Sequence, residues 1–584
     1  MQSNYDKFPV LRVQGFENAC LTGWDKIITA VGQRLPDTTR GKAVVVAEFY
    51  HGVDAQEVRK ALIEGLKPDW VFDTEQAYYT EEQIDALALP DVTGDRIFGF
   101  MTRLTIGRYF DPEKLEAARR QLQSLEKGLV LVSGVGAAHL AEHWDVLAYA
   151  DMARWEIQQR MRRHEVANLG ASNFTEDVAR KYKRAYFVDW RVCDRIKKQL
   201  LPACDFLLDT HKPRQPKMIH GETLWAGLRQ ATRRPFRVAP FFDPGPWGGQ
   251  WMKEVCGLDP SVINYAWCFD CVPEENSLLL GFGGDVVEIP ALNLVFFYPE
   301  ELLGGSVYAR FGPEFPIRFD FLDTIDGGNL SLQVHPLTEY IQEHFGMHYT
   351  QDESYYILDA KEGAHVYLGL KEGVRKEAMI EALRDAQNGG APFDAEQFVE
   401  KWQAQKHNHF LIPAGTVHCS GKDTMVLEIS ATPYIFTFKL WDWGRLGLDG
   451  QPRPINIEHG KKVIQWKRDT SWVRRNLINR VEFIAEGKGW REEKTGLHEL
   501  EFIETRRHWF TQKVGHQTGG GVNVLNLVKG REAIVESPDH TFEPFLVHYA
   551  ETFIVPAAAG AYTIRPFGES EGKECATIKA FVRT

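Results

Sequence analysis

Short apolar runs rich in β-branched residues alternate with amphipathic stretches over the first third of the chain. The runs at 42–50 (KAVVVAEFY), 129–136 (LVLVSGVG) and 146–151 (VLAYAD) are typical of buried strands, whereas 112–127 and 152–164 have the period of helices. Because strand and helix follow each other in turn, the pattern predicts an α/β parallel sheet with helical crossovers.

From about residue 236 the pattern changes to short apolar runs separated by proline and glycine, which favours β structure. The runs are LNLVFFYP (292–299), FPIRFDFLD (315–323), LSLQVHP (330–336), YYILDA (355–360) and HVYLGL (365–370). One helical stretch interrupts them at 374–405. We therefore expect a multidomain fold, with an α/β domain at 1–232, a β-rich core carrying the helical insertion at 233–465, and a small β domain at 466–584.

The composition of the 584 residues is that of a globular protein, with 44% hydrophobic and 25% charged residues. A net charge of −12 argues against a general binder of nucleic acid or anionic membranes, but a local basic pocket could still hold a small anionic substrate. The first residues lack the regions of a signal peptide and no apolar run reaches the length of a membrane span, so we expect a cytoplasmic protein. Eight cysteines are too few for a disulfide framework, and we expect Cys268 and Cys271 to be reduced thiols near a core.

The run LSLQVHP places Gln333 and His335 two residues apart, so that both side chains lie on the same face of a strand. That face would otherwise be apolar. Either hydrogen bonds satisfy this pair, or the pair binds a ligand.

Two further residues follow in strand positions. Glu353 opens the run ESYYIL, and His418 ends the string Pro-x-Gly-x-x-His, which is the second half of the cupin signature. A single histidine on an apolar face is more often a satisfied core residue, but four candidates in this order favour a metal site. Two imidazoles, a carboxylate and an amide suit Zn²⁺, with Fe²⁺ and Mn²⁺ as alternatives. The other histidines of this region lack such a setting: His344, His348, His365, His407 and His409.

Over about 236–465 the chain resembles the type I mannose-6-phosphate isomerases, a family of cupin (jelly-roll) barrels. The strings that carry the resemblance are PWGG, EELLGGSVYARFGPEFP, FLDTIDGGNLSLQVHP, ESYYIL, FLIPAGTVHCSG, LEIS, LWDWGR and GQPRPINIEHGKKVI. The resemblance implies one zinc ion bound by Gln333, His335, Glu353 and His418. It also implies interconversion of mannose 6-phosphate and fructose 6-phosphate through a cis-enediol, which needs a base and an electrophile.

The chain departs from the family at two places. Lys439 stands where the family has a reaction-centre arginine, and Asp320 where it commonly has a lysine. Lysine keeps the charge but not the planar fork of arginine. Arg318 lies on the same strand face as Asp320 and can compensate. The catalytic candidates are therefore Lys439, Glu428 and Arg445, and the substrate-binding candidates are Arg318 and Trp247, the latter in PWGG. The sequence does not identify the base, for which Glu428 and a metal-bound hydroxide are both candidates.

The α/β region, over roughly 35–230, resembles P-loop kinases of the uridine-kinase type in its order of elements. The phosphate loop GxxxxGK[ST] is absent after the first strand, where the chain reads YHGVDAQEV. We therefore expect a degenerate kinase-like domain. Arginines 154, 160, 162 and 163 are either a phosphate-binding lid or a solvated basic face. The string ETFIVPAAAGAYTI near the C-terminus resembles the metal-free second cupin domain of the isomerases.

Two other functions stay open at this point. One is an iron-dependent cupin oxygenase, since two histidines and a carboxylate also describe an oxygen-activating site. The other is a sugar-phosphate sensor without turnover, which needs the metal and the phosphate pocket but no proton transfer. The expected partner is a small hexose 6-phosphate, and the sequence leaves open whether the chain forms a homo-oligomer.

Overall fold

The computed structural model describes residues 3–39, 41–431, 435–496 and 498–584, and the chain forms two compact units. Unit 1 comprises residues 1–9, 231–273 and 298–584, and unit 2 comprises residues 10–230 and 274–297. The segment 274–297, which lies within the predicted domain at 233–465, is thus grouped with the α/β part. No division separates residues 466–584 from the rest of unit 1, so that boundary stays a prediction.

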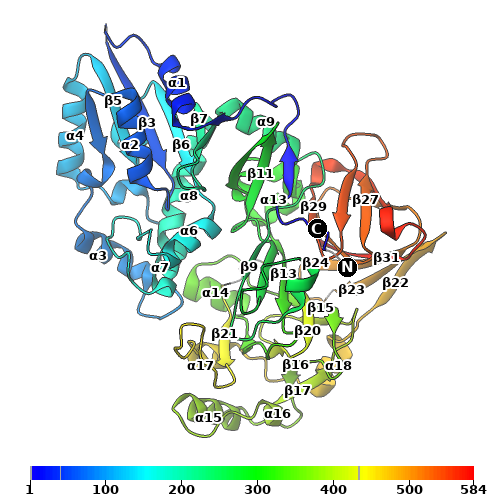
Figure 1. The fold of residues 1–584 in the computed structure, drawn as a ribbon. Helices are drawn as coiled ribbons and strands as arrows, with labels where there is room; N and C mark the ends of the chain where they lie inside the picture. Colours follow the sequence, from blue (N-terminus) through cyan, green and yellow to red (C-terminus); the bar gives the residue numbers. More distant parts are fainter. Residues whose placement is uncertain (1–2, 40, 432–434, 497) are drawn as a thin grey trace. The chain divides into compact units, whose positions relative to one another are not determined.

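Unit 2 is built on a seven-stranded sheet in the order β2-β8-β7-β6-β3-β5-β4 (Figure 1). Its strands are β2 (Leu21–Thr22), β3 (Lys42–Phe49), β4 (Trp70–Asp73), β5 (Gly128–Gly134), β6 (Val146–Asp151), β7 (Phe206–Asp209) and β8 (Lys217–His220). β3 to β7 are mutually parallel, β8 pairs antiparallel with β7 at one edge, and β2 pairs antiparallel with β8. The predicted parallel α/β sheet is confirmed. A small sheet of β1 (Val10–Arg12), β11 (Ser277–Phe282) and β12 (Asp285–Pro290) belongs to the same unit.

Helices join the parallel strands, and side chains fix where they begin. The main ones are α1 (Trp24–Arg34), α2 (Ala55–Leu66), α3 (Glu81–Val92), α4 (Pro112–Ser124), α5 (Ala137–Ala141), α6 (Arg154–Arg162), α7 (Val178–Arg184), α8 (Trp190–Leu200) and α9 (Gly221–Ala231). The predicted helices at 112–127 and 152–164 correspond to α4 and α6. Asp111 caps α4 by accepting from two backbone N–H groups of its first turn, and Pro112 occupies the first helical position.

The turn after β3, where a phosphate loop would lie, is closed by the chain's own groups. Asp54 caps α2 by accepting from the N–H of Glu57, so a carboxylate occupies the position that suits an anion. Glu48, at the end of β3, accepts from the N–H groups of Gly136 and Ala138. The glycine-rich turn after β5 therefore binds a carboxyl group of the chain itself, and burial raises the pKa of Glu48 to about 8.

The arginine side chains of the basic helix α6 are not all exposed to solvent. Arg154 and Arg160 are 3% and 4% exposed. Arg154 Nη2 donates to Asp194 Oδ2 at 2.7 Å, and Arg160 donates to the carbonyls of Gly52, Thr210 and His211. Arg154 thus joins α6 to α8, and Arg160 holds two loops of unit 2 together, which is neither of the roles expected for them.

Unit 1 contains two facing antiparallel sheets that carry the metal-ligand candidates. The first, in the order β18-β15-β20-β13-β10-β9, consists of β18 (His409–Ile412), β15 (Glu353–Ala360), β20 (Thr424–Ala431), β13 (Ile317–Asp323), β10 (Trp267–Cys271) and β9 (Phe241–Asp243). The second, in the order β17-β16-β19-β14-β21, consists of β17 (Val399–Gln403), β16 (His365–Leu370), β19 (His418–Ser420), β14 (Leu332–Val334) and β21 (Phe438–Trp441). Alternate residues of these strands point into the space between the sheets. Cys268 and Cys271 on β10 are both buried, and neither forms a disulfide in the described ranges, as expected.

Two predictions for the β-rich region were wrong in part. The run at 292–299 forms α11 (Leu292–Phe297) and is followed by α12 (Pro299–Leu303) and α13 (Gly305–Phe311). A continuous apolar run of this length has no alternation, so its period could not separate strand from buried helix. The helical insertion contains α15 (Lys376–Gln387) and α16 (Ala395–Phe398) but ends in strand β17. Helices α14 (Thr338–Phe345), α17 (Ile457–Val463) and α18 (Thr470–Asn476) complete this part.

The C-terminal part of unit 1 repeats the two-sheet design. One sheet is β22 (Glu482–Gly487), β23 (Trp490–Gly496), β24 (Ile503–Phe510), β31 (Cys575–Val582), β26 (Asn523–Lys529) and β29 (Thr552–Val555), in that order. The other is β25 (Val514–Gln517), β30 (Ala561–Pro566), β27 (Glu532–Glu536) and β28 (Phe545–His548). Their inner faces share a core that includes Phe510, Leu527 and Phe553. No helix in the described ranges has the length and apolar character needed to cross a bilayer.

Candidate metal centre

Strand pairing brings the predicted ligands together. Gln333 on β14 lies directly opposite His418 on β19, and Glu353 begins β15 in the facing sheet. Their four side chains are almost fully buried, with exposed fractions of 6% for Gln333, 1% for His335, 1% for Glu353 and 0% for His418. The ligand atoms of His335, Glu353 and His418 all lie within 4.8 Å of one another.

The distances within this cluster show that the side-chain nitrogen and oxygen atoms converge on one point. Glu353 Oε1 lies 2.7 Å from His418 Nε2, and Glu353 Oε2 lies 3.2 Å from His335 Nε2. Within the described ranges neither Glu353 Oε1 nor His335 Nε2 has a hydrogen-bond partner. The Gln333 amide lies beside the same point, with Nε2 3.3 Å from His418 Nε2. Buried polar atoms without partners, in a set of imidazole, carboxylate and amide groups, fit a divalent ion of the zinc type.

The remaining ring nitrogens orient both imidazoles. His335 Nδ1 donates to the carbonyl of Phe436 at 3.2 Å, and His418 Nδ1 donates to the carbonyl of Thr416 at 2.9 Å. Each Nε2 atom therefore keeps its lone pair directed at the shared point, which is the tautomer a metal ligand needs. Burial opposes ionisation of Glu353, but the positive charge that the two facing imidazoles carry when protonated holds the pKa of that carboxyl well below its usual range.

The tight turn before His418 places this residue at the start of β19. Gly415 has a φ of +86°, and a Cβ atom there would lie 2.7 Å from Gln465 Cγ and 2.8 Å from the Val463 carbonyl oxygen. Only glycine satisfies both conditions. Arg468, which is 8% exposed, donates from Nη1 to the carbonyls of Pro413 and Ala414 at 2.7 Å each. The sequence carries no local signal for this arginine, because it lies 55 and 54 positions beyond the two residues whose carbonyls it binds.

A second group of charged side chains lies next to the cluster on β13 and β20. Glu428 and Asp320 are opposite each other in register, and Arg318 lies between them: its Nε is 3.0 Å from Asp320 Oδ2, and its Nη2 donates to Glu428 Oε1. Arg318 is 2% exposed. Two carboxylates thus surround this arginine, which was expected to bind substrate. Burial and the charge of Glu353 raise the pKa of Glu428 well above its usual range.

Gln351 joins the two groups. Its Nε2 donates to Glu353 Oε2 at 3.0 Å and to Glu428 Oε1 at 3.3 Å. The sequence offered one signal for this role, namely that Gln351 precedes Glu353 by two residues.

The other predicted residues lie on β21 and in nearby loops. Lys439 is half-buried and pairs with Gln333 across β14 and β21. Burial and the charges of nearby Arg453 and Arg445 lower the pKa of Lys439 to about 7, against the opposing effect of Asp442. Arg445 donates to Asp442 and to the carbonyl of Asn329. Trp247 is only 1% exposed and packs edge-on against Trp267, with ring centroids 4.7 Å apart. This burial assigns Trp247 to the core in the described structure.

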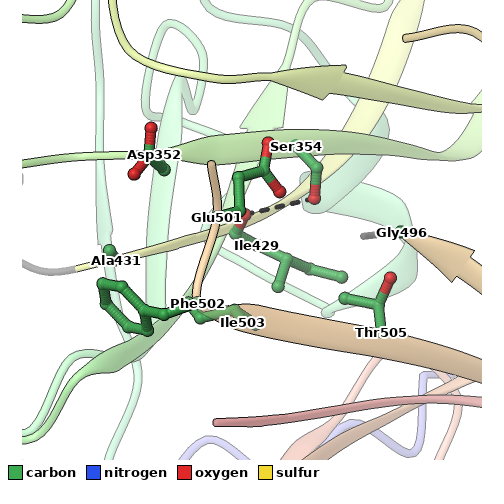
Figure 2. A pocket seen from close by; sticks show the side chains of 9 residues that line it. All are labelled: Asp352, Ser354, Ile429, Ala431, Gly496, Glu501, Phe502, Ile503 and Thr505. Atoms are coloured by element: carbon green, nitrogen blue, oxygen red, sulfur yellow. Dashed lines mark hydrogen bonds between the residues drawn. The ribbon is translucent and has the colours of Figure 1, made fainter. Parts of the chain in front are cut away.

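Figure 2 shows a cavity on the opposite face of β15 and β20. Its volume is about 10 Å³, which is room for about one water molecule. Ser354, whose Oγ donates to the Ile429 carbonyl at 3.2 Å, lies on this face, whereas the neighbouring Glu353 points to the other side. Burial raises the pKa of Glu501, which also lines the cavity, well above its usual range. A cavity of this size cannot hold a sugar.

The two facing sheets and the His/Glu cluster between them form a candidate metal centre inside an antiparallel β architecture. Part of the chain is similar to mannose-6-phosphate isomerases. It is 29% identical over 220 residues to the "Mannose-6-phosphate isomerase" of Streptococcus mutans, covering 37% of this chain and 64% of that protein. It is also 29% identical over 239 residues to the "Probable mannose-6-phosphate isomerase GmuF" of Bacillus subtilis, covering 39% of this chain and 68% of that protein.

The similarity thus spans less than two thirds of the length of the Streptococcus protein. Among solved structures, a mannose 6-phosphate isomerase from Bacillus subtilis aligns with a TM-score of 0.48 and 18% identity, covering 59% of this chain and 99% of that one. Residues 23–233 match a family described as "Domain of unknown function (DUF8485)".

Proposed function

We propose that unit 1 is a metal-dependent aldose-ketose isomerase that interconverts mannose 6-phosphate and fructose 6-phosphate through a cis-enediol. The observation that carries the proposal is the convergence of His335, Glu353 and His418 on one buried point, with their outer nitrogens held by backbone carbonyls. The names of the curated relatives support the choice of reaction.

Gln333, His335, Glu353 and His418 would hold the metal, for which the donor set favours Zn²⁺ over Fe²⁺ or Mn²⁺. When bound, such an ion polarises the sugar oxygens and stabilises negative charge on them. We assign to Glu428 the transfer of the proton between C1 and C2. It is a buried carboxyl group that Gln351 links directly to the ligand Glu353. Arg318 and Ser430 both donate to Glu428 Oε1 and so fix its orientation.

A second candidate function is a sugar-phosphate sensor without turnover. The specific observation in its favour is the pairing of the buried Arg318 with both Asp320 and Glu428, which engages this guanidinium within the chain. A sensor needs only binding, whereas an isomerase also needs a proton carrier that can reach the sugar.

The deciding experiment is a proton NMR time course of mannose 6-phosphate with zinc-reconstituted protein, run beside a chelated sample. In deuterated water we expect metal-dependent formation of fructose 6-phosphate and deuterium incorporation at C2. The His418→Ala variant should show neither, and His348→Ala, which removes an exposed histidine, should behave like the parent. Zinc-loaded parent protein that binds the sugar without exchanging its C2 proton would favour the sensor.

For residues 1–232 we propose a kinase-like domain that has lost its phosphate loop. The parallel sheet with the first strand of the set near its centre supports this proposal, as does the carboxylate of Asp54 at the start of α2, where a phosphate would lie. An expected outcome is the absence of ATP hydrolysis by the purified chain. A cytoplasmic location remains a prediction.

A further inference from the structure

A pair of histidines lies between the two sheets of the C-terminal part of unit 1. His508 on β24 is two positions before the core residue Phe510. His516 on β25, in the other sheet, is two positions after the core residue Val514. Because alternate residues of a strand project from the same face, both imidazoles point into the space between the sheets. The two residues are 2% and 6% exposed, and their ring centroids are 4.4 Å apart.

Most of the hydrogen-bonding capacity of this pair is unused. In the part of the chain that the structure describes, both ring nitrogens of His516 and Nδ1 of His508 have no hydrogen-bond partner. The two rings are therefore in contact without a hydrogen bond between them. Thr577, directly opposite His508 on β31, is fully buried, and its hydroxyl is also without a partner in the described ranges. Buried polar atoms of this kind are costly unless a ligand satisfies them.

Glu492 fixes the tautomer of His508. Glu492 Oε1 lies 3.3 Å from His508 Nε2 and also accepts from Arg506 Nη1 at 2.9 Å. The hydrogen bonds from His508 and Arg506 lower the pKa of Glu492 to about 2, so this carboxylate is ionised and His508 Nε2 carries the proton. The lone pair of His508 then lies on Nδ1, the atom without a partner. A carboxylate on the outer nitrogen of a histidine is the usual support of a metal-bound imidazole.

Both imidazoles are neutral, which is the form that binds a metal. Burial holds the pKa of His516 well below its usual range and also lowers the pKa of His508. Tyr562 stacks on His516 with ring centroids 5.0 Å apart and the planes inclined by 11°, which fixes the direction of the His516 ring. The Tyr562 hydroxyl in turn accepts from Asn523 Nδ2 at 2.9 Å.

The charged groups next to the pair balance one another. Arg506 donates to both Glu492 and Glu504. Burial lowers the pKa of Lys579 to about 8, against the opposing charges of the same two carboxylates. Two cations and two carboxylates have no net charge, so a divalent ion meets no surplus of positive charge there. Release of the Lys579 proton would make the surroundings more favourable to such an ion.

We propose that His508 and His516 form a second metal site, separate from the candidate metal centre, for a transition ion that prefers imidazole ligands, such as Zn²⁺, Ni²⁺ or Cu²⁺. His508 binds through Nδ1, and Glu492 is a positioning residue that holds the opposite nitrogen. In the described ranges the set of three His, Cys, Asp or Glu ligands is the one at Glu353, so this second site has two protein nitrogens and positions open to water. Binding should therefore be weaker than at the first centre. The proposal does not depend on the isomerase activity.

The test counts zinc bound to the full chain after dialysis against excess Zn²⁺, by mass spectrometry. We expect about two ions per chain in the parent, about one in His516→Phe, about one in His418→Ala, and none in the double variant. His516→Phe keeps an aromatic ring against Tyr562. His540→Asn changes an exposed histidine of the same unit and should bind as the parent does.

Stability gives a readout that does not rely on counting ions. An ion held by His508 and His516 links the two facing sheets, so Zn²⁺ should raise the apparent midpoint of thermal unfolding of His418→Ala. It should leave the midpoint of the His418→Ala/His516→Phe double variant unchanged.

A milder variant covers the case in which His516→Phe does not fold. Glu492→Gln leaves both imidazoles in place and should weaken the second zinc-binding step at least about tenfold without changing the first. One zinc ion per chain in the parent would overturn the second site. So would a second ion that binds His516→Phe, or Glu492→Gln, as tightly as the parent, since that ion would be adventitious.

Discussion

The Oε1 atom of Glu353 lies 2.7 Å from His418 Nε2, yet in the described ranges it accepts no hydrogen bond. His335 Nε2 approaches the other carboxylate oxygen to 3.2 Å and is likewise without a partner. Two buried imidazoles and a carboxylate therefore direct polar atoms, among them Glu353 Oε1 and His335 Nε2 without partners, at a point where a cation would satisfy all three groups.

Removing one ligand should therefore empty the site. His418→Ala should reduce bound zinc by at least about tenfold at limiting metal, because the set of four candidate ligands loses one of its two imidazoles. Metal content after gel filtration, measured by mass spectrometry, checks this. His348→Ala should retain the parental content, since its side chain is exposed and pairs with Glu314. Full occupancy in His418→Ala would remove His418 from the site.

Arg318 should be a stability residue as well as a neighbour of the reaction centre. Arg318→Met leaves Asp320 and Glu428 buried without their cation, which should cost about 3–5 kcal/mol. The urea midpoint of unit 1, followed by hydrogen exchange of β13 and β20, reports the loss. Arg384→Met breaks an exposed pair and should cost at most about 1 kcal/mol. Equal losses of unfolding free energy in the two variants would show that the buried pairing stabilises unit 1 no more than an exposed ion pair does.

The charge of Lys439 should matter more than its shape. Lys439→Met is expected to lower kcat/KM for mannose 6-phosphate on the order of 100-fold with zinc content unchanged, because a cation next to the ligands is lost. Lys439→Arg keeps the charge and should stay within about tenfold of the parent. Steady-state kinetics on the two variants measure whether charge or shape is required at this position. A fully active Lys439→Met would exclude this residue from the site.

Glu48 should make the stability of unit 2 depend on pH. Its pKa is raised by burial from 4.5 to about 8, so between these values the folded protein holds a proton that the unfolded chain has released. Stability should then fall as pH rises from about 4.5 to 8, by up to about 1.4 kcal/mol per pH unit. Above pH 8 the folded carboxyl also ionises and the loss levels off.

Urea unfolding of unit 2 at pH 5.5 and 7.5 measures this slope. Glu48→Gln, which cannot ionise, should flatten it, whereas the control Glu64→Gln changes an exposed carboxylate on α2 and should not. An identical slope in the parent and Glu48→Gln would contradict the assignment.

The sequence pattern was sufficient to predict the structure wherever the period of a strand or a single turn motif determines it. The spacing of Gln333 and His335 places both on one strand face, and Pro-x-Gly-x-x-His predicts the glycine turn that delivers His418. The strands β3, β5 and β6 were likewise predictable, because continuous β-branched runs between helices indicate a buried parallel sheet. The prediction of a strand at 292–299 was wrong because this run is also apolar without alternation. Such a run fits a buried strand or a buried helix, and only its packing decided that it forms a helix.

By itself, then, the sequence determined the classes of domain, the four metal-ligand candidates and the positions where the chain departs from the isomerases. Tertiary structure alone decided which charges remain available. Arg318 donates to Glu428, which lies 110 positions later in the sequence. Trp247 is buried against Trp267. Asp442 forms ion pairs with Arg445 and Arg453, which follow it in the chain. The physical reason is that strand period and turn chemistry are local, whereas the electrostatic state of a side chain depends on every charge that the folded chain brings within a few ångströms of it.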